Sequence, residues 1–237
     1  MESPSFSALP DPSQLMERNR EVQKLLLNYR IIMCTPHRPY GVLMLVNLNG
    51  AADGSTPQNH LGVCTSCAEV LERVPQPADD VLVLTADVLA DGPVLPMLRQ
   101  LRKLPSPPKT LITVESPHRV FIRELIKVGA DALIAVSNVG RGGLLEALRC
   151  LDRGERSIDA ECRAMIEDRG PASDELSARE VEILQLVAKG LTNRAIGKQL
   201  CIADVTARDH VRRILHKLAV SDRSAAVMEG VRLGYIH

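Results

Sequence analysis

Hydrophobic residues make up 45% of the 237 residues and charged residues make up 24%, a composition typical of a soluble globular protein with one or two domains. The 29 basic and 29 acidic residues cancel, so positive charge can gather only locally. No apolar run approaches the roughly 20 residues that cross a bilayer, which excludes a membrane span. The amino terminus, "MESPSFSALPDPSQ", lacks the basic start and apolar stretch of a secretory signal. We therefore expect a cytoplasmic protein with no membrane partner.

The first candidate element is an amphipathic helix in the amino-terminal extension, residues 1–29. Within residues 13–30, one helical stripe collects the apolar side chains of Leu15, Val22, Leu25, Leu26 and Tyr29. Such a stripe predicts packing on the chain's own domain, and a dimer contact is the alternative.

Residues 30–160 alternate apolar runs with helical patterns. Continuous apolar runs of this kind are typical of strands buried on both faces of a parallel sheet. They lie at residues 29–34, 60–65, 80–85, 109–114 and 131–136, and helical patterns include residues 93–104, 118–130 and 141–154. The alternation predicts an α/β, doubly wound domain on a parallel five-stranded sheet.

A polar stretch with a Gly-Pro break, "EDRGPASDE", predicts a linker at residues 161–173, ahead of an all-α domain of four helices at residues 174–237. Ser177 and Glu180 have the spacing of a reciprocal capping box, and Gly190 suits a left-handed helix stop. The later helices are expected at about residues 193–200, 204–218 and 221–233. Only "CIAD" separates the second helix from the third, which indicates a helix-turn-helix.

Positive charge gathers in this helix-turn-helix, where six Lys/Arg and two acids give residues 192–217 a net charge of +4. On the third helix, the buried stripe is expected to be Ala207, Val211, Ile214 and Leu218. An α-helix fits the major groove, where arginine pairs with guanine, so double-stranded DNA is the expected partner. The residues expected at base edges are Val205, Arg208, Asp209 and Arg212. The residues expected at phosphates are Arg213 and Lys217, together with Thr192 and Asn193 at a helix start.

The segment "LSAREVEILQLVAKGLTNRAIGKQL", followed by "T-x-R-x-HV-x-x-IL-x-KL-x-V", resembles the DNA-binding domain of the LuxR family, the NarL/FixJ type of response regulator. The resemblance implies base contacts by Arg208, Asp209 and Arg212. It also implies a homodimer formed through the fourth helix and makes RNA polymerase a further candidate partner. The residues that it places near the DNA backbone are Thr192, Asn193, Thr206 and Lys217.

Three residues depart from the family pattern: Ala195 replaces Glu, Ala203 replaces Ser, and Asp209 replaces a neutral residue. Loss of Ser at an N-cap costs about 0.5–2 kcal/mol. We expect Asp204 to take over the capping of the third helix from Ala203.

The segments "LVLTADVLADG" and "GADALIAV" resemble parts of the receiver domain that precedes this DNA-binding domain in the family. By this resemblance the aspartate to be phosphorylated falls on Ala86, the Mg²⁺-binding acidic pair falls on Thr35 and Pro36, and the lysine falls on Val136. These vacant positions imply a pseudo-receiver, regulated independently of phosphorylation. Asp87 lies next to the vacant position but lacks the acidic pair, and Asp91 lies in an Asp-Gly turn.

Among the six cysteines, Cys64 and Cys67 form a C-x-x-C with no second ligand pair, so we expect no metal site. Buried thiols are the expected role, and a redox switch is the alternative because a thiol at a helix start has a lowered pKa. No nucleophile–base pair or phosphate loop indicates an enzyme, and no cofactor is expected. The leading hypothesis is a DNA-binding transcription regulator. The alternative is an interaction protein that titrates a related regulator or a polymerase subunit, suggested by Asp209 and the missing caps.

Overall fold

The computed structural model describes residues 12–49, 59–115, 118–167 and 175–236. Contacts divide the chain into two compact units, residues 1–116 with 130–161 and residues 117–129 with 162–237. The domain limits expected at residues 30, 160 and 174 stay predictions.

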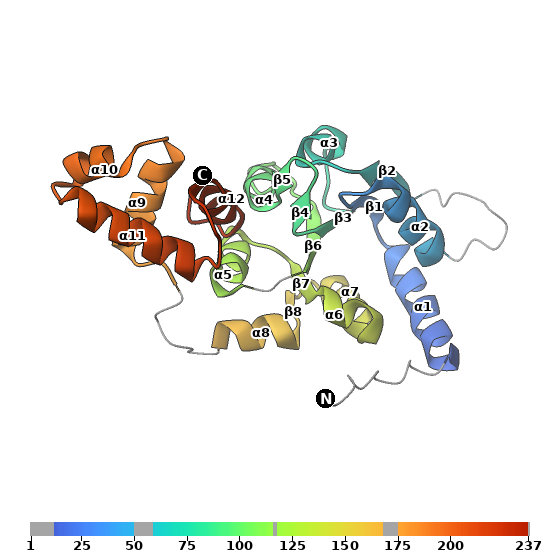
Figure 1. The fold of residues 1–237 in the computed structure, drawn as a ribbon. Coiled ribbons are helices and arrows are strands. Elements are labelled where there is room, and N and C mark those ends of the chain that lie inside the picture. The colour runs from blue at the N-terminus through green and yellow to red at the C-terminus, as the bar shows by residue number, and fades with distance from the viewer. Residues whose placement is uncertain (1–11, 50–58, 116–117, 168–174, 237) are drawn as a thin grey trace, which may run out of the picture. The chain divides into compact units, whose positions relative to one another are not determined.

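The first unit is built on a parallel sheet with the strand order β2-β1-β3-β6-β7-β8 (Figure 1). All five expected strands are confirmed. They are β1 (Arg30–Cys34), β2 (His60–Cys64), β3 (Val81–Ala86), β6 (Lys109–Val114) and β7 (Ala132–Ala135). The order reverses between β1 and β3, and in such sheets ligands bind beyond the carboxyl ends of the strands at this switch point.

The expected five-stranded sheet is corrected to six strands. The sixth, β8 (Ser157–Ile158), pairs in parallel with β7 through Ser157 opposite Ala132 and Ile158 opposite Leu133. A strand of two residues is too short to show an apolar run in the sequence, so only its pairing with β7 identifies β8. A separate antiparallel pair is formed by β4 (Val88–Leu89) and β5 (Gly92–Pro93).

The helices of the first unit follow the strands. They are α1 (Pro12–Leu26), α2 (Arg38–Asn49), α3 (Cys67–Arg73), α4 (Leu95–Leu101), the single turn α6 (Val136–Asn138), the π-helical turn η1 (Val139–Gly143) and α7 (Leu144–Asp152). The helix expected from residue 141 has its regular part from Leu144 onward, because Gly142 has a φ of 101° and interrupts the helical backbone.

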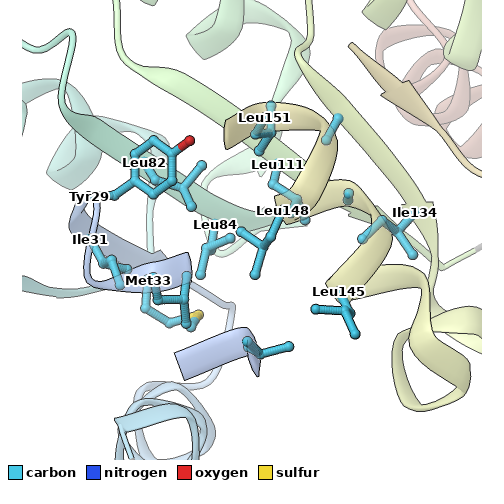
Figure 2. Packing of buried hydrophobic residues seen from close by; sticks show 14 of the residues in the cluster. Tyr29, Ile31, Met33, Leu82, Leu84, Leu111, Ile134, Leu145, Leu148 and Leu151 are labelled. Atoms are coloured by element: carbon cyan, nitrogen blue, oxygen red, sulfur yellow. The ribbon is translucent and has the colours of Figure 1, made fainter. Parts of the chain in front are cut away.

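Alternate residues of the strands meet α1 and α7 in one apolar core (Figure 2). Val22 and Leu26 of α1 are buried there together with Tyr29, and Leu25 packs against them. This confirms that the amino-terminal stripe packs on its own domain. The side chain of Leu15, which we placed on the same stripe, lies outside the described residues.

The second unit contains α5 (Arg119–Val128) and most of α8 (Ala160–Glu167), followed by α9 (Ala178–Ala188), α10 (Asn193–Leu200), α11 (Asp204–Lys217) and α12 (Arg223–Arg232). The four carboxyl-terminal helices lie where the sequence predicts them. Residues 160–167 form α8 where we expected a linker from residue 161. This helix buries Cys162 and is rich in good helix formers, which explains why it forms. Residues 168–174 lie outside the described residues.

Candidate nucleic-acid interface and the carboxyl edge of the sheet

Local sequence positions the two helices of the helix-turn-helix. Thr192 caps α10, because its hydroxyl accepts a hydrogen bond from the Ala195 N–H at 3.3 Å. Cys201, with φ of 53°, ends α10 in the left-handed conformation. A Cβ added to Gly197 would lie 2.8 Å from the carbonyl oxygen of Ile202. Glycine therefore allows α10 to approach the turn that leads into α11.

The inner side of α11 is buried as its periodicity predicts. Ala207, Ile214 and Leu218 have exposed fractions of 0%, 1% and 7%. Val211, the fourth member of the expected stripe, is half-buried. This apolar side packs α11 against its neighbours and leaves the opposite side free to meet a ligand.

The outer side of α11 carries the side chains that we expected at DNA. Val205 is 61% exposed, and the side chain of Arg208 is 65% exposed. Arg208 and Arg212 are separated by four residues, about one helical turn, and project from the same side. Exposed side chains on α11 include Val205, Thr206, Arg208, Asp209, Arg212 and Arg213.

The start of α11 differs from what we expected. Its N-cap is Ala203, which makes no side-chain hydrogen bond to the helix, and Asp204 is the first helical residue. Asp204 instead lies 3.9 Å from the Arg208 guanidinium, one turn along the helix. The expectation that Asp204 replaces the missing cap is therefore wrong, because Asp204 already has a helical backbone.

Lys217 also lies differently from its expected place at a phosphate. Its Nζ donates to Oε2 of Glu180 at 2.8 Å and to the carbonyl oxygen of Glu175 at 2.9 Å. Its side chain is only 20% exposed. Glu180 also completes the expected capping box with Ser177. The sequence carries no signal for the pair, because 37 residues separate Lys217 from Glu180.

The four positions that the resemblance assigns to the phosphorylation machinery meet at the carboxyl edge of the sheet in the first unit. Thr35 and Pro36 follow β1, Ala86 ends β3, and Val136 follows β7. All four line one cavity of about 560 Å³. The sequence predicts this proximity, because the carboxyl ends of parallel strands share one edge of the sheet.

The side chains at these positions do not fit a Mg²⁺ ion, which prefers carboxylate, phosphate and water oxygens. Thr35, Pro36 and Ala86 supply no carboxylate. The neighbouring Asp87 is 4% exposed, and its Oδ2 accepts from the Glu115 N–H at 3.4 Å. Within the described ranges, no group of three or more His, Cys, Asp or Glu residues is arranged to hold a metal ion.

Comparisons with known proteins show which family and which relatives this chain resembles. Residues 174–229 match the family described as bacterial regulatory proteins, luxR family. The chain is 36% identical over 124 residues to the transcriptional regulatory protein DegU of Brevibacillus brevis, a match that covers 47% of this chain and 52%, about half, of DegU. It is 30% identical over 156 residues to the nitrate/nitrite response regulator protein homolog of Haemophilus influenzae, covering 65% of this chain and 74% of that protein.

The chain belongs to the LuxR family of response regulators. It is a DNA-binding transcription regulator of that family, and its relative DegU is described as a transcriptional regulatory protein. RcsB from Salmonella enterica serovar Typhimurium, solved bound to a promoter with a phosphomimetic, shares the fold. The TM-score is 0.59 at 16% identity, over 87% of this chain and 99% of that chain.

In this LuxR-family regulator, Cys34, Cys64 and Cys67 are free thiols, and Cys64 interacts with Cys34. Cys64 lies opposite Cys34 on the neighbouring strand, and a hydrogen bond between the two thiols lowers the pKa of Cys64. Cys67 begins α3, yet burial and the nearby Asp91 carboxylate raise its pKa to about 12. The expectation of a lowered pKa at this helix start is therefore wrong.

Asp91 has a structural role in the regulator. Its carboxylate accepts from the N–H groups of Cys67 at 2.7 Å and Ala68 at 3.1 Å, which caps α3 from outside the helix. Burial alone acts to raise the pKa of Asp91, but these backbone hydrogen bonds outweigh it and the pKa is lowered.

No helix in the part of the regulator that the structure describes combines the length and apolarity required to cross a membrane.

Proposed function

We propose that this LuxR-family regulator reads double-stranded DNA with the outer side of α11. The observation that carries the proposal is the exposed pair Arg208 and Arg212, one turn apart on a helix whose other side is buried. Each guanidinium can donate two hydrogen bonds to O6 and N7 of a guanine in the major groove. Val205 can contact a thymine methyl group, and Asp209 can accept from a cytosine amino group.

Phosphate contacts position the reading helix. Arg213 and Thr206 are exposed on α11, and Thr192 and Asn193 lie at the start of α10, where backbone N–H groups favour a phosphate. We leave Lys217 out of the interface because its ammonium is held by Glu180.

The regulator is further proposed to bind DNA as a homodimer through α12. Met228 on this helix is 74% exposed, which leaves a large apolar side chain for a partner copy. A likeness in fold supports the proposal: two RcsB dimers bound to two parallel DNAs share the fold of this chain, with a TM-score of 0.60 at 16% identity over 86% of this chain. RNA polymerase is proposed as a further partner in transcription.

The receiver-like domain is proposed to work without aspartyl phosphorylation. Ala86 offers no oxygen to phosphorylate, and Val136 offers no ammonium to a phosphoryl group. Asp87 is buried and accepts the Glu115 N–H, and the acidic pair that would hold Mg²⁺ beside it is replaced by Thr35 and Pro36.

Two measurements on the intact protein test this function. DNA that co-purifies with the protein is sequenced and compared with that of Arg212→Ala, with Arg156→Ala, an exposed arginine of the first unit, as the control. We expect enriched sequences that Arg212→Ala loses and Arg156→Ala keeps. Identical enrichment in all three proteins would contradict reading by α11. Incubation with acetyl phosphate and Mg²⁺ is expected to give no acid-labile adduct, and an adduct would contradict the second proposal.

A second candidate function is titration of a related regulator or of a polymerase subunit. The uncapped start of α11 and the exposed acidic Asp209 favour it, because both weaken the presentation of a cationic helix to DNA. Weak DNA binding beside tight association with a full receiver protein would support titration. A redox switch through Cys64 and Cys67 remains a third proposal, and the position of Cys34 opposite Cys64 offers an alternative partner. Loss of DNA affinity on oxidation that Cys64→Ser abolishes would support it.

A further inference from the structure

We propose that the cavity at the carboxyl edge of the receiver-like sheet binds an amphipathic small molecule with an apolar body and an amine head. This inference rests on the proposed function, because a site without phosphorylation chemistry is free to take another ligand. The cavity has a volume of about 560 Å³, within the range of about 300–1,000 Å³ that is usual for small-molecule sites.

The floor of the cavity is apolar. Met33, Leu84 and Leu111 come from the adjacent strands β1, β3 and β6, and all three belong to the buried cluster that also contains Leu145 and Leu148 (Figure 2). The residues that complete this apolar lining from the helical side are Met44 of α2, Val139 of η1 and Leu144 of α7. A ligand lying on this floor would remove apolar surface from water, which favours binding.

The vacant phosphorylation positions are what make the mouth of the cavity accessible to an apolar group. Ala86 places a methyl group where the family has a carboxylate, and Val136 replaces a lysine. Val136 is 49% exposed beside the cavity, so an isopropyl group faces the solvent that a ligand would displace.

Hydrogen-bond acceptors are among the polar groups that line the cavity. Two carboxylates, those of Asp87 and Glu115, line the cavity, and a carboxylate has about four acceptor sites. The hydroxyls of Thr85 and Thr113 already donate to the carbonyl oxygens of Ala86 and Thr85. Each hydroxyl oxygen can still accept.

The charges that line the cavity select the head group. Among the described residues that line the cavity there is no lysine or arginine, and His37 is the basic side chain that reaches it. A phosphate or carboxylate head would therefore meet two carboxylates and no fixed cation. An ammonium head gains charge-assisted hydrogen bonds instead.

The test uses three probes that share one apolar chain: n-octylamine, n-octanol and octanoate. Isothermal titration calorimetry on the intact protein is expected to show saturable binding of n-octylamine. The affinity for octanoate is expected to be lower by about tenfold or more. Binding of octanoate as tight as that of n-octylamine, or no binding of either, would overturn the proposal.

Two substitutions that fill the cavity locate the site. Ala86→Leu and Val136→Phe are each expected to weaken n-octylamine binding about tenfold or more, whereas Ala188→Leu, an exposed position on α9, leaves it unchanged. Val136 is partly exposed, so Val136→Phe keeps the test valid if Ala86→Leu does not fold. If a variant with a filled cavity folds and still binds n-octylamine with unchanged affinity, the amine binds elsewhere and the proposal is wrong.

A double variant tests the head group. Asp87→Asn and Glu115→Gln together are expected to remove the preference for n-octylamine over n-octanol while n-octanol still binds. A preference that survives both changes would exclude the carboxylates as its cause. An acid-labile phosphoryl adduct reports failure of the proposed function, whereas absent amine binding without an adduct reports failure of this inference alone.

Discussion

The Nζ of Lys217 lies 2.8 Å from Oε2 of Glu180 and donates to it, which joins the end of α11 to the first turn of α9. The same ammonium donates to the carbonyl oxygen of Glu175. The Glu180 side chain is only 4% exposed, so its carboxylate depends on this partner and on Ser177 for hydrogen bonds. The pair thus holds α11 against α9.

Replacing Lys217 by Met is expected to lower the free energy of unfolding by about 2 kcal/mol. A buried carboxylate that loses its partner is strongly destabilising, and the partial exposure of Lys217 reduces the usual cost. Urea denaturation followed by circular dichroism measures the change. Lys198→Met, an exposed lysine on α10, serves as the control. Equal stability of the two variants would show that the ion pair contributes nothing.

The stability of the helical domain is expected to depend on pH through Glu180. Burial acts to raise the pKa of Glu180, but hydrogen bonds from Lys217 and Ser177 outweigh it, so the pKa lies below the ordinary value of 4.5. A carboxyl whose pKa is lower in the folded state stabilises the fold above its unfolded pKa, and this contribution is lost as pH falls through the folded value. Unfolding free energy should therefore decrease as pH falls below about 4.5, and Glu180→Gln should reduce this dependence. If Glu180→Gln leaves the slope of unfolding free energy against pH unchanged, other carboxyl groups cause the pH dependence.

Restoring a side-chain cap to α11 is expected to stabilise the protein. Ala203 has φ of −66° and ψ of 149°, the extended conformation of an N-cap, but no side chain to accept a helix N–H. Ala203→Ser should add about 0.5–1 kcal/mol to the free energy of unfolding. Ser177→Ala, which removes the existing cap of α9, should subtract a similar amount or more. Thermal denaturation checks both, and an Ala203→Ser variant no more stable than the wild type would show that the cap is satisfied in another way.

Substitutions of the α11 arginines are expected to differ in their effects on the sequence preference and on the salt dependence of DNA binding. Arg208→Ala and Arg212→Ala should each cost about 1–3 kcal/mol on the preferred DNA sequence and relax specificity. Arg213→Ala should weaken binding to all sequences and reduce the slope of log K against log salt by about 1. Fluorescence anisotropy at several salt concentrations, on preferred and scrambled duplexes, measures both effects. The assignment fails if Arg213→Ala changes sequence preference while Arg212→Ala does not.

The cysteines are expected to differ in reactivity toward iodoacetamide. Cys201 is exposed, whereas Cys34 and Cys64 are buried. Since only the thiolate reacts and the pKa of Cys67 is raised to about 12, Cys67 should react slowly at pH 8 and faster by about tenfold for each unit of pH up to that value. Mass spectrometry of timed samples should find Cys201 labelled first. Rapid labelling of Cys67 at neutral pH would restore the C-x-x-C as a candidate redox pair.

The sequence by itself was sufficient for five strands of the sheet and for the four carboxyl-terminal helices. Apolar runs and helical periodicity are local properties of the chain, so they located β1, β3, β6 and the limits of α10 within a residue or two. The capping box of Ser177 and Glu180 involves residues three apart, and it too was readable before any fold was known. The exposed arginine pair follows from spacing on a single helix.

Only the tertiary structure decided the relationships between residues far apart in the chain. Ile158 of β8 has a strand partner only because the fold brings it beside Leu133 of β7. Lys217, which we expected near a phosphate, instead donates to Glu180, which lies 37 positions earlier in the chain. The raised pKa of Cys67 likewise comes from burial and from Asp91, 24 residues away. Periodicity describes one element at a time, whereas burial, charge pairing and cavities arise between elements, so these features appear only when the chain has folded.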